Sequence, residues 1–477
     1  MIFQNKKNQT INTLISYFLN TLFLGNLAYL IYYYPNVPEW QYGNMLKING
    51  FTVLIWTLVS FFSALISNYS KNYLKGFKYH TKFSILALGF TFSIMVFVMA
   101  NHVFLLLITW FLMGVFMSQL IGVDSRWGEA REASKFALRY FVSGSFFLSA
   151  GVLLLAFQTG DFTLSGILVK VNSLPQNITL LSGLCIITAA IIQSAIYPFH
   201  RWLLSAMTAP TPASALMHAG FVNGSGILLT LFSTVLFTSN TLIILFVIGA
   251  LTAVVAQFAK LLQVNVKQKL ACSTIAQMGF MIMQCGLGFF NAAVVHLILH
   301  GFYKAYLFLS AGEEVGYAKP SKPVQVKIKP LQAVIVLFFG VLGAFIFAYL
   351  TGKGTEMNSG IFLTLIVAIT VGQVTYNIIK EKSLSFLQKI VIPPLVFLSG
   401  IVVYAVIYKG VTDLMHDMPM TDVPMPLSFI EIVVGIAFLV GFFIMKLGIY
   451  RKYPRLYVKL LNSTQPSKRT VLMFKSK

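Results

Sequence analysis

The chain has 477 residues, of which 57% are hydrophobic and only 10% are charged. A soluble globular domain carries about 25% charged residues, so this composition excludes an ordinary soluble protein. The 35 Lys and Arg residues greatly outnumber the 13 Asp and Glu residues, but they lie between apolar runs long enough to cross a bilayer. We therefore expect them to orient helices in a membrane rather than to bind nucleic acid.

Fourteen apolar runs predict transmembrane helices, because each crossing needs about 20 apolar residues. The breaks between the runs are short, which predicts a single polytopic membrane domain over residues 1–450. When the N-terminus is placed in the cytoplasm, most Lys and Arg residues fall on that side, as the positive-inside rule requires, and the C-terminus is cytoplasmic as well. The expected spans are 11–34, 51–67, 82–100, 102–122, 138–157, 177–208, 212–237, 241–263, 271–287, 291–311, 330–351, 359–379, 390–408 and 427–448.

The sequence gives no sign of catalysis, a bound metal or a removed leader. The first run is too long for a signal peptide and lacks a small-residue cleavage site, so we expect a retained helix. Cys185, Cys272 and Cys285 lie in apolar stretches without a C-x-x-C pair, which supports neither a disulfide framework nor a thiolate metal site. No nucleotide-binding loop, zinc spacing or catalytic triad occurs in a plausible context. We therefore expect no catalytic residue, no metal ligand and no cofactor in this chain.

Polar residues inside the predicted membrane region begin near Pro198. Gln193 precedes this proline and can form hydrogen bonds but cannot store a proton, whereas Arg201 is expected to snorkel to the interface. Two prolines, Pro210 and Pro212, come shortly before His218. A helix broken at membrane depth exposes backbone groups that are tolerated beside a hydrated cavity. The segment around His218 is therefore either part of such a cavity or a simple re-entry between helices.

Three titratable residues, His296, His300 and Lys304, are spaced i, i+4 and i+8 in one predicted helix. This spacing places them on one helical face. Because a charge in the hydrocarbon region costs a few kcal/mol, such a row predicts a proton or ion pathway. The alternative is a set of hydrogen bonds that only join helices. Lys267 starts the preceding helix and either belongs to the pathway or marks the inner membrane face.

The tail, residues 451–477, contains eight Lys and Arg residues and no acid. Such a segment is attracted to anionic lipid headgroups and can anchor the topology. The alternative is a docking surface for a soluble acidic partner. The sequence leaves both interpretations open.

Three blocks in order resemble the proton-translocating antiporter family, which includes subunit L of bacterial NADH:quinone oxidoreductase and the Mrp antiporter subunits. The resemblance extends from about Asn49 to Gly312. It implies two inverted five-helix repeats, each with a broken helix, in an antiporter-like core over about residues 100–390. The blocks are PFHRWLLSAMTAPTPASALMHA (198–219), KQKLACSTIAQMG (267–279) and HLILHGFYKAYLFL (296–309).

The resemblance also assigns roles to individual positions. The family's central histidine matches His218, and its paired histidine and lysine match His296, His300 and Lys304. The glutamate of the family's W-E pair is replaced by Phe111, and the lysine of its G-K-S-A-Q motif is replaced by Gln193. Neither replacement can titrate. The resemblance thus implies a protein in which ions move down their gradient past the histidines and Lys304.

One branch of the family is more similar than the others. The runs LMHAGFVNG (216–224) and STIAQMGFMIMQCGLG (273–288) resemble DabB, the membrane subunit of the DabA–DabB inorganic carbon pumps. This implies a subunit of the bacterial inner membrane that conducts H+ or Na+ to drive uptake of CO2 or bicarbonate. A DabA-like cytoplasmic partner on the inner face would hold the zinc site. The alternatives are a pump subunit of an NADH:quinone oxidoreductase-like or hydrogenase-like complex, and a Mrp-type cation/proton antiporter subunit.

Overall fold

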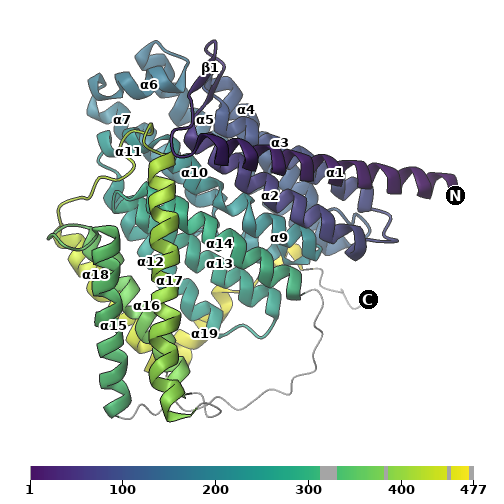
Figure 1. Ribbon diagram of the computed structural model, residues 1–477. Helices are drawn as coiled ribbons and strands as arrows, with labels where there is room; N and C mark the ends of the chain where they lie inside the picture. Colours follow the sequence, from purple (N-terminus) through teal and green to yellow (C-terminus); the bar gives the residue numbers. More distant parts are fainter. Residues whose placement is uncertain (1, 312–329, 381–384, 448–452, 472–477) are drawn as a thin grey trace.

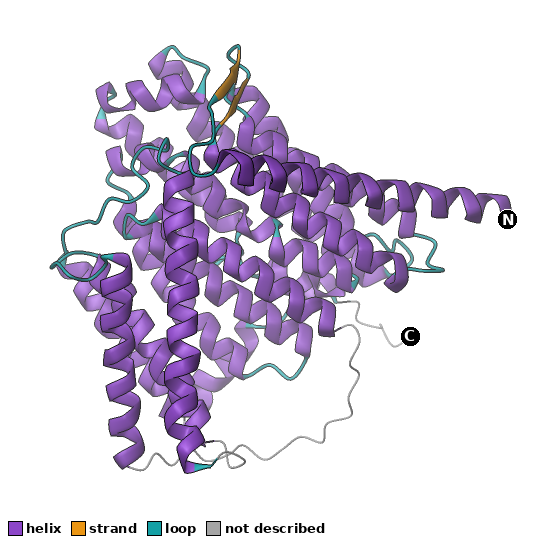
Figure 2. Ribbon diagram, in the orientation of Figure 1, coloured by secondary structure: helices purple, strands orange, loops and turns teal. Residues whose placement is uncertain are grey.

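The computed structural model of the protein describes residues 2–311, 330–380, 385–447 and 453–471. Helices dominate this part of the chain (Figure 2). The strands that it contains, β1 (Trp40–Tyr42) and β2 (Leu46–Ile48), form one antiparallel hairpin at the edge of the molecule. The predicted all-helical class is confirmed.

The long helices form the body of the molecule (Figure 1). They are α1 (Ile2–Tyr33), α2 (Gly50–Tyr73), α3 (His80–Met99), α4 (Val103–Ile121), α5 (Gly128–Thr159), α7 (Gln176–Gln193), α12 (Leu242–Leu261), α13 (Val266–Gly286), α14 (Phe290–Ala311), α15 (Pro330–Thr351), α16 (Gly360–Lys380), α17 (Phe386–Leu414) and α18 (Phe429–Leu447). Shorter helices connect or follow them: α6 (Leu164–Lys170), α8 (Arg201–Ser205), α9 (Thr211–Ala219), α10 (Gly224–Leu231), α11 (Ser233–Thr238) and α19 (Pro454–Ser463), with 3-10 turns η1 (Val171–Ser173), η2 (Ala206–Thr208), η3 (Phe221–Asn223) and η5 (Lys468–Thr470).

Eleven helical stretches of the described chain are long and apolar enough to cross a membrane. One of them, Thr211–Leu231, joins α9 and α10 across a short interruption. Two shorter apolar helices, Gly360–Tyr376 and Phe429–Gly441, and the more polar α13 complete the set. Each predicted span therefore has a helical counterpart among the described residues, and the predicted membrane bundle of about fourteen helices is confirmed.

The predicted span 177–208 is wrong as a single helix. α7 ends at Gln193, and the chain next becomes helical in α8. Pro198 cannot donate a backbone hydrogen bond, and Ala195 has a positive φ of 55°, so a helix cannot pass through this segment. The interruption before His218 agrees with prediction, since α9 begins with a proline in its first turn.

α5 begins at Gly128, well before the predicted start at residue 138. The prediction followed only the apolar residues, whereas the first turns of α5 are polar. An ion pair between Lys135 and Glu132 is 2.9 Å long and joins neighbouring turns of this extension. Helices that leave the bilayer are thus longer than the apolar runs that reveal them.

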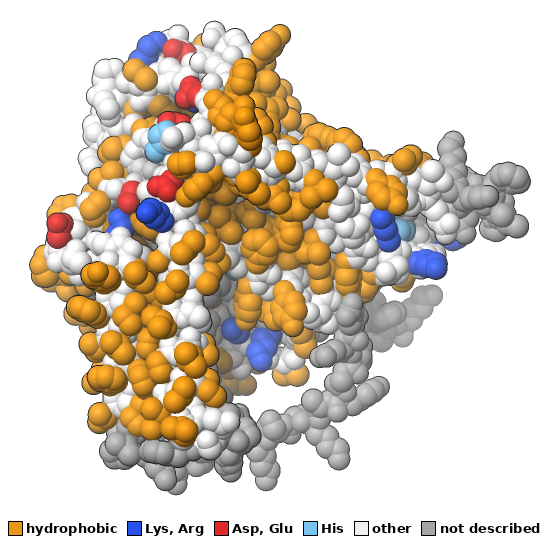
Figure 3. Space-filling model, viewed as in Figure 1, with side chains coloured by type: hydrophobic (Ala, Val, Ile, Leu, Met, Phe, Trp, Pro, Cys, Tyr) orange, Lys and Arg blue, Asp and Glu red, His pale blue; other side chains and the backbone are white. Residues whose placement is uncertain are grey.

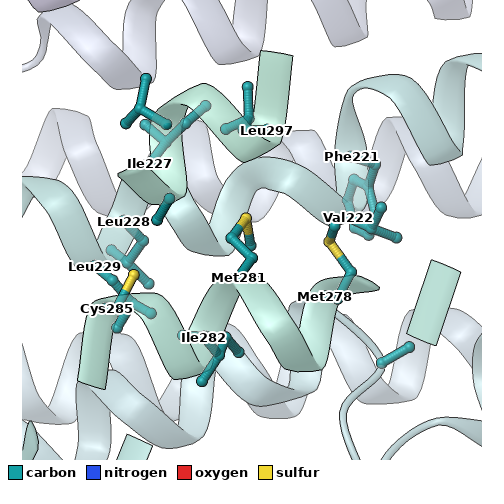
Figure 4. Close-up of a cluster of buried hydrophobic side chains, with 14 of the residues drawn as sticks. Phe221, Val222, Ile227, Leu228, Leu229, Met278, Met281, Ile282, Cys285 and Leu297 are labelled. Atoms are coloured by element: carbon teal, nitrogen blue, oxygen red, sulfur yellow. The ribbon is translucent and has the colours of Figure 1, made fainter. Parts of the chain in front are cut away.

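The centre of the bundle is packed from α10, α13 and α14, whose apolar side chains interlock (Figure 4). Met281 and Leu297 in this cluster are 0% and 1% exposed. Beside it, α12 and α13 approach closely at Gly249 and Gly279. A Cβ atom on Gly279 would lie 2.8 Å from the backbone nitrogen of Ala253, so only glycine fits this crossing.

α15, α16 and α17 pack on one another along one side of the bundle (Figure 1). Polar contacts join this group to α14 near the end of α17. Asn291 donates hydrogen bonds of 2.9 Å to Tyr408 Oη and to Thr412 Oγ1. Lys353, which follows α15, forms an ion pair with Asp422. α16 is continuous over Gly360–Lys380, so the second broken helix that the resemblance implies does not lie there.

Apolar side chains cover the outward faces of α15 and α17 in Figure 3, and charged residues gather near the margins of this face. Leu337 and Phe345 of α15 are each 70% exposed. A continuous apolar surface of this kind is unsuitable for water and suits lipid. The protein is therefore a multi-pass membrane protein.

Candidate functional site

α14 carries the three titratable residues that the sequence places on one helical face. The ring centroids of His296 and His300 lie 6.1 Å apart, and Lys304 follows one turn later. His300 is 5% exposed and Lys304 is fully buried. The helix thus holds two imidazoles and an ammonium group in a row inside the protein.

His296 and His300 line a cavity of about 490 Å³ between α13, α14 and the α15–α17 group. Most of its wall is apolar, but polar groups face it from several helices. The side-chain oxygen of Gln284 and both ring nitrogens of His300 are buried without a hydrogen-bond partner among the described residues. Buried polar atoms are normally satisfied by protein or by water, so this cavity suits water molecules. The other polar lining residues are Gln277, Tyr303, Thr370 and Tyr404.

A second cavity of about 430 Å³ lies next to the first, between α12, α13, α16 and α18. Gln277 and Phe280 of α13 line both cavities. The Phe280 ring lies 5.1 Å from the ring of His296. Lys260, near the end of α12, lines the second cavity. An amide and an aromatic ring therefore separate Lys260 from His296.

Gln277 and Lys260 were not predicted as site residues. Gln277 lies inside a family motif, and this is the one feature of the sequence that points to it. An amide does not titrate, so its residue type does not predict a site for proton transfer. Lys260 lies in the last turn of α12, where a lysine ordinarily marks the membrane boundary. The position of Gln277 between the cavities, and of Lys260 in the second cavity, depends on how α12 and α13 pack against α16 and α18, which the sequence does not reveal.

His218 lies in α9 and is fully buried. Its ring stacks on Phe308 of α14, with centroids 4.2 Å apart and planes 14° apart. Neither ring nitrogen has a hydrogen-bond partner among the described residues. His218 and Lys304 do not line the two cavities. The structure thus divides the predicted pathway residues: His296 and His300 face a cavity, whereas His218 of α9 and Lys304 of α14 are enclosed by protein.

Two lysines donate to backbone carbonyl groups. Lys304 Nζ lies 3.1 Å from the carbonyl oxygen of Leu270 in α13. Lys267 Nζ lies 2.8 Å from the carbonyl oxygen of Ala209, just before α9. Neither lysine is paired with an acid among the described residues. Lys267 therefore contacts the broken helix that carries His218, which a mere marker of the membrane face need not do.

The interruption after His218 was not predicted, and side chains from α7 satisfy its backbone groups. Gln193 Nε2 donates to the carbonyl of Phe221 over 3.4 Å, and Ser194 Oγ donates to the carbonyl of Val222 over 2.5 Å. Gly220 and the dipeptide Asn223-Gly224 were the local signals of this break. Free carbonyl groups at membrane depth must be paired, so the polar end of α7 stabilises the broken α9–α10 segment.

The structure places Gln193 in the interior and Phe111 outside it. Gln193 is 3% exposed, whereas Phe111 is 41% exposed on α4. The α4 side chain beside Gln193 is Met113, since both lie within 4 Å of the position of a Cβ atom on Gly224. Phe111 thus lies on the outward face of α4, two residues before the buried Met113. Neither Met113 nor Gln193 can titrate.

Comparison with known proteins identifies the family of this chain. The family described as "NADH:quinone oxidoreductase/Mrp antiporter, TM" matches residues 100–375, which is more than half of the chain. The chain belongs to this family. The match reaches further toward the C-terminus than Gly312, where the resemblance was expected to end, and so includes α15 and most of α16.

Curated relatives in this family support the DabB-like resemblance. The chain is 35% identical to the probable inorganic carbon transporter subunit DabB of Bacillus anthracis, over 69% of this chain and 64% of the relative. It is 36% identical to the protein of that name in Bacillus subtilis (strain 168), over 59% and 55%. It is also 31% identical to NADH-ubiquinone oxidoreductase chain 5 of Cryphonectria parasitica, over 56% and 41%. The matched region spans less than two thirds of each relative.

Two solved structures show the same fold. A chain of the Mrp complex from Dietzia sp. DQ12-45-1b matches with a TM-score of 0.57 and 18% identity, over 97% of this chain and 50% of that chain. A chain of the membrane-bound sulfane sulfur reductase, an archaeal respiratory membrane complex, matches with a TM-score of 0.57 and 19% identity, over 98% and 97%. At such low identity these likenesses describe the fold alone.

Proposed function

We propose that this protein is the membrane subunit of an energy-coupled uptake system for CO2 or bicarbonate. In this proposal, H+ or Na+ moves down its gradient past His296, His300 and Lys304, with His218 and Lys267 on the broken-helix side. In the same proposal, the protein lies in the bacterial inner membrane and both of its termini are on the cytoplasmic side. The relatives named as inorganic carbon transporter subunits support this choice of substrate.

The observation that carries the ion pathway is the cavity beside α14. Two imidazoles face it, and one of them, His300, has both nitrogens free to bond water. A neutral imidazole has one ring nitrogen that donates and one that accepts a hydrogen bond, so it can pass protons between water molecules. Lys304 lies one turn beyond and places a positive charge at the end of the row. Titratable groups at membrane depth cost free energy, so such a row supports an ion pathway.

The pair Met113 and Gln193 favours passive conduction over redox-driven pumping. The resemblance places a switch of glutamate and lysine in this part of the family fold, and two residues that cannot titrate cannot operate it. Ions then follow their gradient, and the free energy released drives the partner. A DabA-like cytoplasmic partner on the inner face would hold the zinc-dependent chemistry.

Growth in air tests the proposal. Cells that lack carbonic anhydrase receive this chain together with the protein encoded by the neighbouring gene, and either protein alone serves as the control. We expect growth only with the pair. Failure of the wild-type pair to restore growth would argue against inorganic carbon uptake.

Purification distinguishes the alternatives, since each predicts a different partner. A large zinc-containing protein that copurifies supports the proposed function. Iron–sulfur or flavin subunits would instead support a subunit of a redox complex, which the likeness to NADH-ubiquinone oxidoreductase chain 5 keeps as the second candidate. Isolation without any partner would support a stand-alone antiporter.

A further inference from the structure

The C-terminal segment is fixed to the bundle by hydrogen bonds. His200 Nε2 lies 2.8 Å from the carbonyl oxygen of Ser463 at the end of α19. Further along, the backbone nitrogen of Ser467 and Thr470 Oγ1 each lie 3.1 Å from Ser205 Oγ of α8. Ser467 and Thr470 are 8% and 4% exposed. These contacts hold α19 against α8, although about 250 residues separate them.

A cationic groove of about 700 Å³ results from this docking. Arg201 reaches it from α8, and Arg455 and Lys459 reach it from one face of α19, because they are four residues apart. No carboxylate lines the groove. None of the three cations has an acidic partner among the ion pairs of the described residues. Three unpaired positive charges around one space favour an anionic ligand.

Apolar side chains next to the groove identify the kind of anion. Leu456 and Val458 of α19 are 43% and 51% exposed, and Tyr453 just before the helix is 60% exposed. α19 also packs against α12, which crosses the membrane. A short helix with basic and apolar faces beside a membrane span is suited to the boundary between headgroups and acyl chains. The groove is far larger than a bicarbonate or chloride ion needs.

We propose that the groove between α8 and α19 binds the phosphate headgroup of an anionic phospholipid. Arg201, Arg455 and Lys459 supply the charge, and Asn462 offers an amide that can donate a hydrogen bond. The acyl chains lie along the exposed apolar residues of α19. Bound lipid would strengthen the docking of α19 next to the break that follows α7. This site is separate from the ion pathway and does not depend on the proposed function.

Lipid titration of the purified full chain in neutral detergent tests the site. We expect short-chain phosphatidylglycerol to bind at least tenfold more tightly than phosphatidylcholine, and less tightly as salt increases. The double variant Arg201→Gln/Arg455→Gln should lose this preference. The matched control Lys468→Gln/Arg469→Gln removes the same charge from exposed positions of the tail and should keep it.

Hydrogen exchange provides a second measurement on the same samples. Phosphatidylglycerol should slow exchange over residues 454–470 in the wild type and in the control variant, but not in the groove variant. Unchanged lipid preference in a folded groove variant would overturn the proposal. So would inorganic phosphate that binds as tightly as phosphatidylglycerol. Protection of the tail by a glutamate-rich peptide and not by lipid would overturn it in favour of protein docking.

Discussion

The side chain of Lys304 donates a hydrogen bond of 3.1 Å to the backbone carbonyl of Leu270, and this is the only hydrogen bond of that side chain among the described residues. A fully buried lysine usually pairs with an acid. Here the positive charge has a neutral partner and lies one turn from His300 on α14. A buried lysine without an acidic partner contributes little to the stability of the fold, but it is suited to gain and lose a proton.

Replacement of Lys304 by methionine separates its contribution to fold stability from its role in ion conduction. Because buried charges are often replaced by apolar groups without loss of stability, Lys304→Met should unfold at the same temperature as the wild type or higher. We expect uptake-dependent growth in the carbonic anhydrase-deficient cells to fall at least tenfold. Lys269→Met, which changes an exposed lysine at the start of α13, should grow normally. Normal growth of Lys304→Met would remove this lysine from the ion pathway.

Glutamine at position 300 tests whether the imidazole carries protons or only joins helices. An amide forms hydrogen bonds but does not titrate near neutral pH. We expect His300→Gln to lose uptake as completely as His300→Ala. His416→Gln, on an exposed loop, is the control. If glutamine but not alanine supports uptake, His300 only joins helices through hydrogen bonds.

Because α12 and α13 cross closely at Gly279, one added methyl group at this position should reduce the stability of the fold. Gly279→Ala should lower the free energy of unfolding by about 1–3 kcal/mol, because the added Cβ meets backbone atoms of Gly249 and Ala253 that cannot move aside. Gly400 of α17 has no atom within 4 Å of such a Cβ. Gly400→Ala should therefore be neutral or slightly stabilising. Thermal unfolding in detergent measures both, and equal midpoints would contradict the packing argument.

The ion pair between Lys353 and Asp422 is expected to contribute to the free energy of unfolding, because it fixes α15 to the loop that follows α17. Asp422 also accepts a hydrogen bond of 3.3 Å from Tyr408. Asp422→Asn leaves the half-buried lysine without a charged partner and should cost about 1–3 kcal/mol. Glu132→Gln removes an exposed partner of Lys135 and should cost less than about 1 kcal/mol. A similar loss in both variants, measured by thermal unfolding, would show that the Asp422 contact adds nothing.

Docking of the C-terminal segment should weaken in acid. Burial lowers the pKa of His200 below its ordinary value of 6.5, and the positive charge of Arg201 acts in the same direction, while the hydrogen bond to Ser463 opposes them. Tyr197 stacks on the same ring at 3.7 Å. Because the docked state disfavours the protonated imidazole, its contribution is complete above about pH 6.5 and is lost as the pH falls toward the lowered pKa.

Protection factors of amides in residues 454–470, measured between about pH 5 and pH 8, test this dependence. We expect protection to decrease below about pH 6.5 in the wild type. His200→Gln should show a weak dependence throughout, since it keeps a hydrogen-bond donor without a titrating group. Constant protection in the wild type would contradict the role of His200.

The sequence predicted the helices well because a bilayer imposes the same length on each crossing. Every predicted span has a helical counterpart, and the i, i+4, i+8 spacing placed His296, His300 and Lys304 on one face. The single span 177–208 failed because an apolar run does not reveal where the backbone stops being helical. The sequence likewise did not reveal that Phe111 lies on the outward face of α4, since a motif gives the neighbourhood of a residue but not the face that it takes on its helix.

Length, apolarity and helical spacing are local properties, and the sequence by itself determined them: a membrane bundle of about fourteen helices with a titratable row on α14. Only the tertiary structure decided which members of that row face a cavity and which are enclosed. It also brought Gln277 and Lys260 to the cavities, Met113 to Gln193, and Arg201 to Arg455. These pairs lie on different helices, and their contacts depend on how whole helices pack, which no short stretch of sequence encodes.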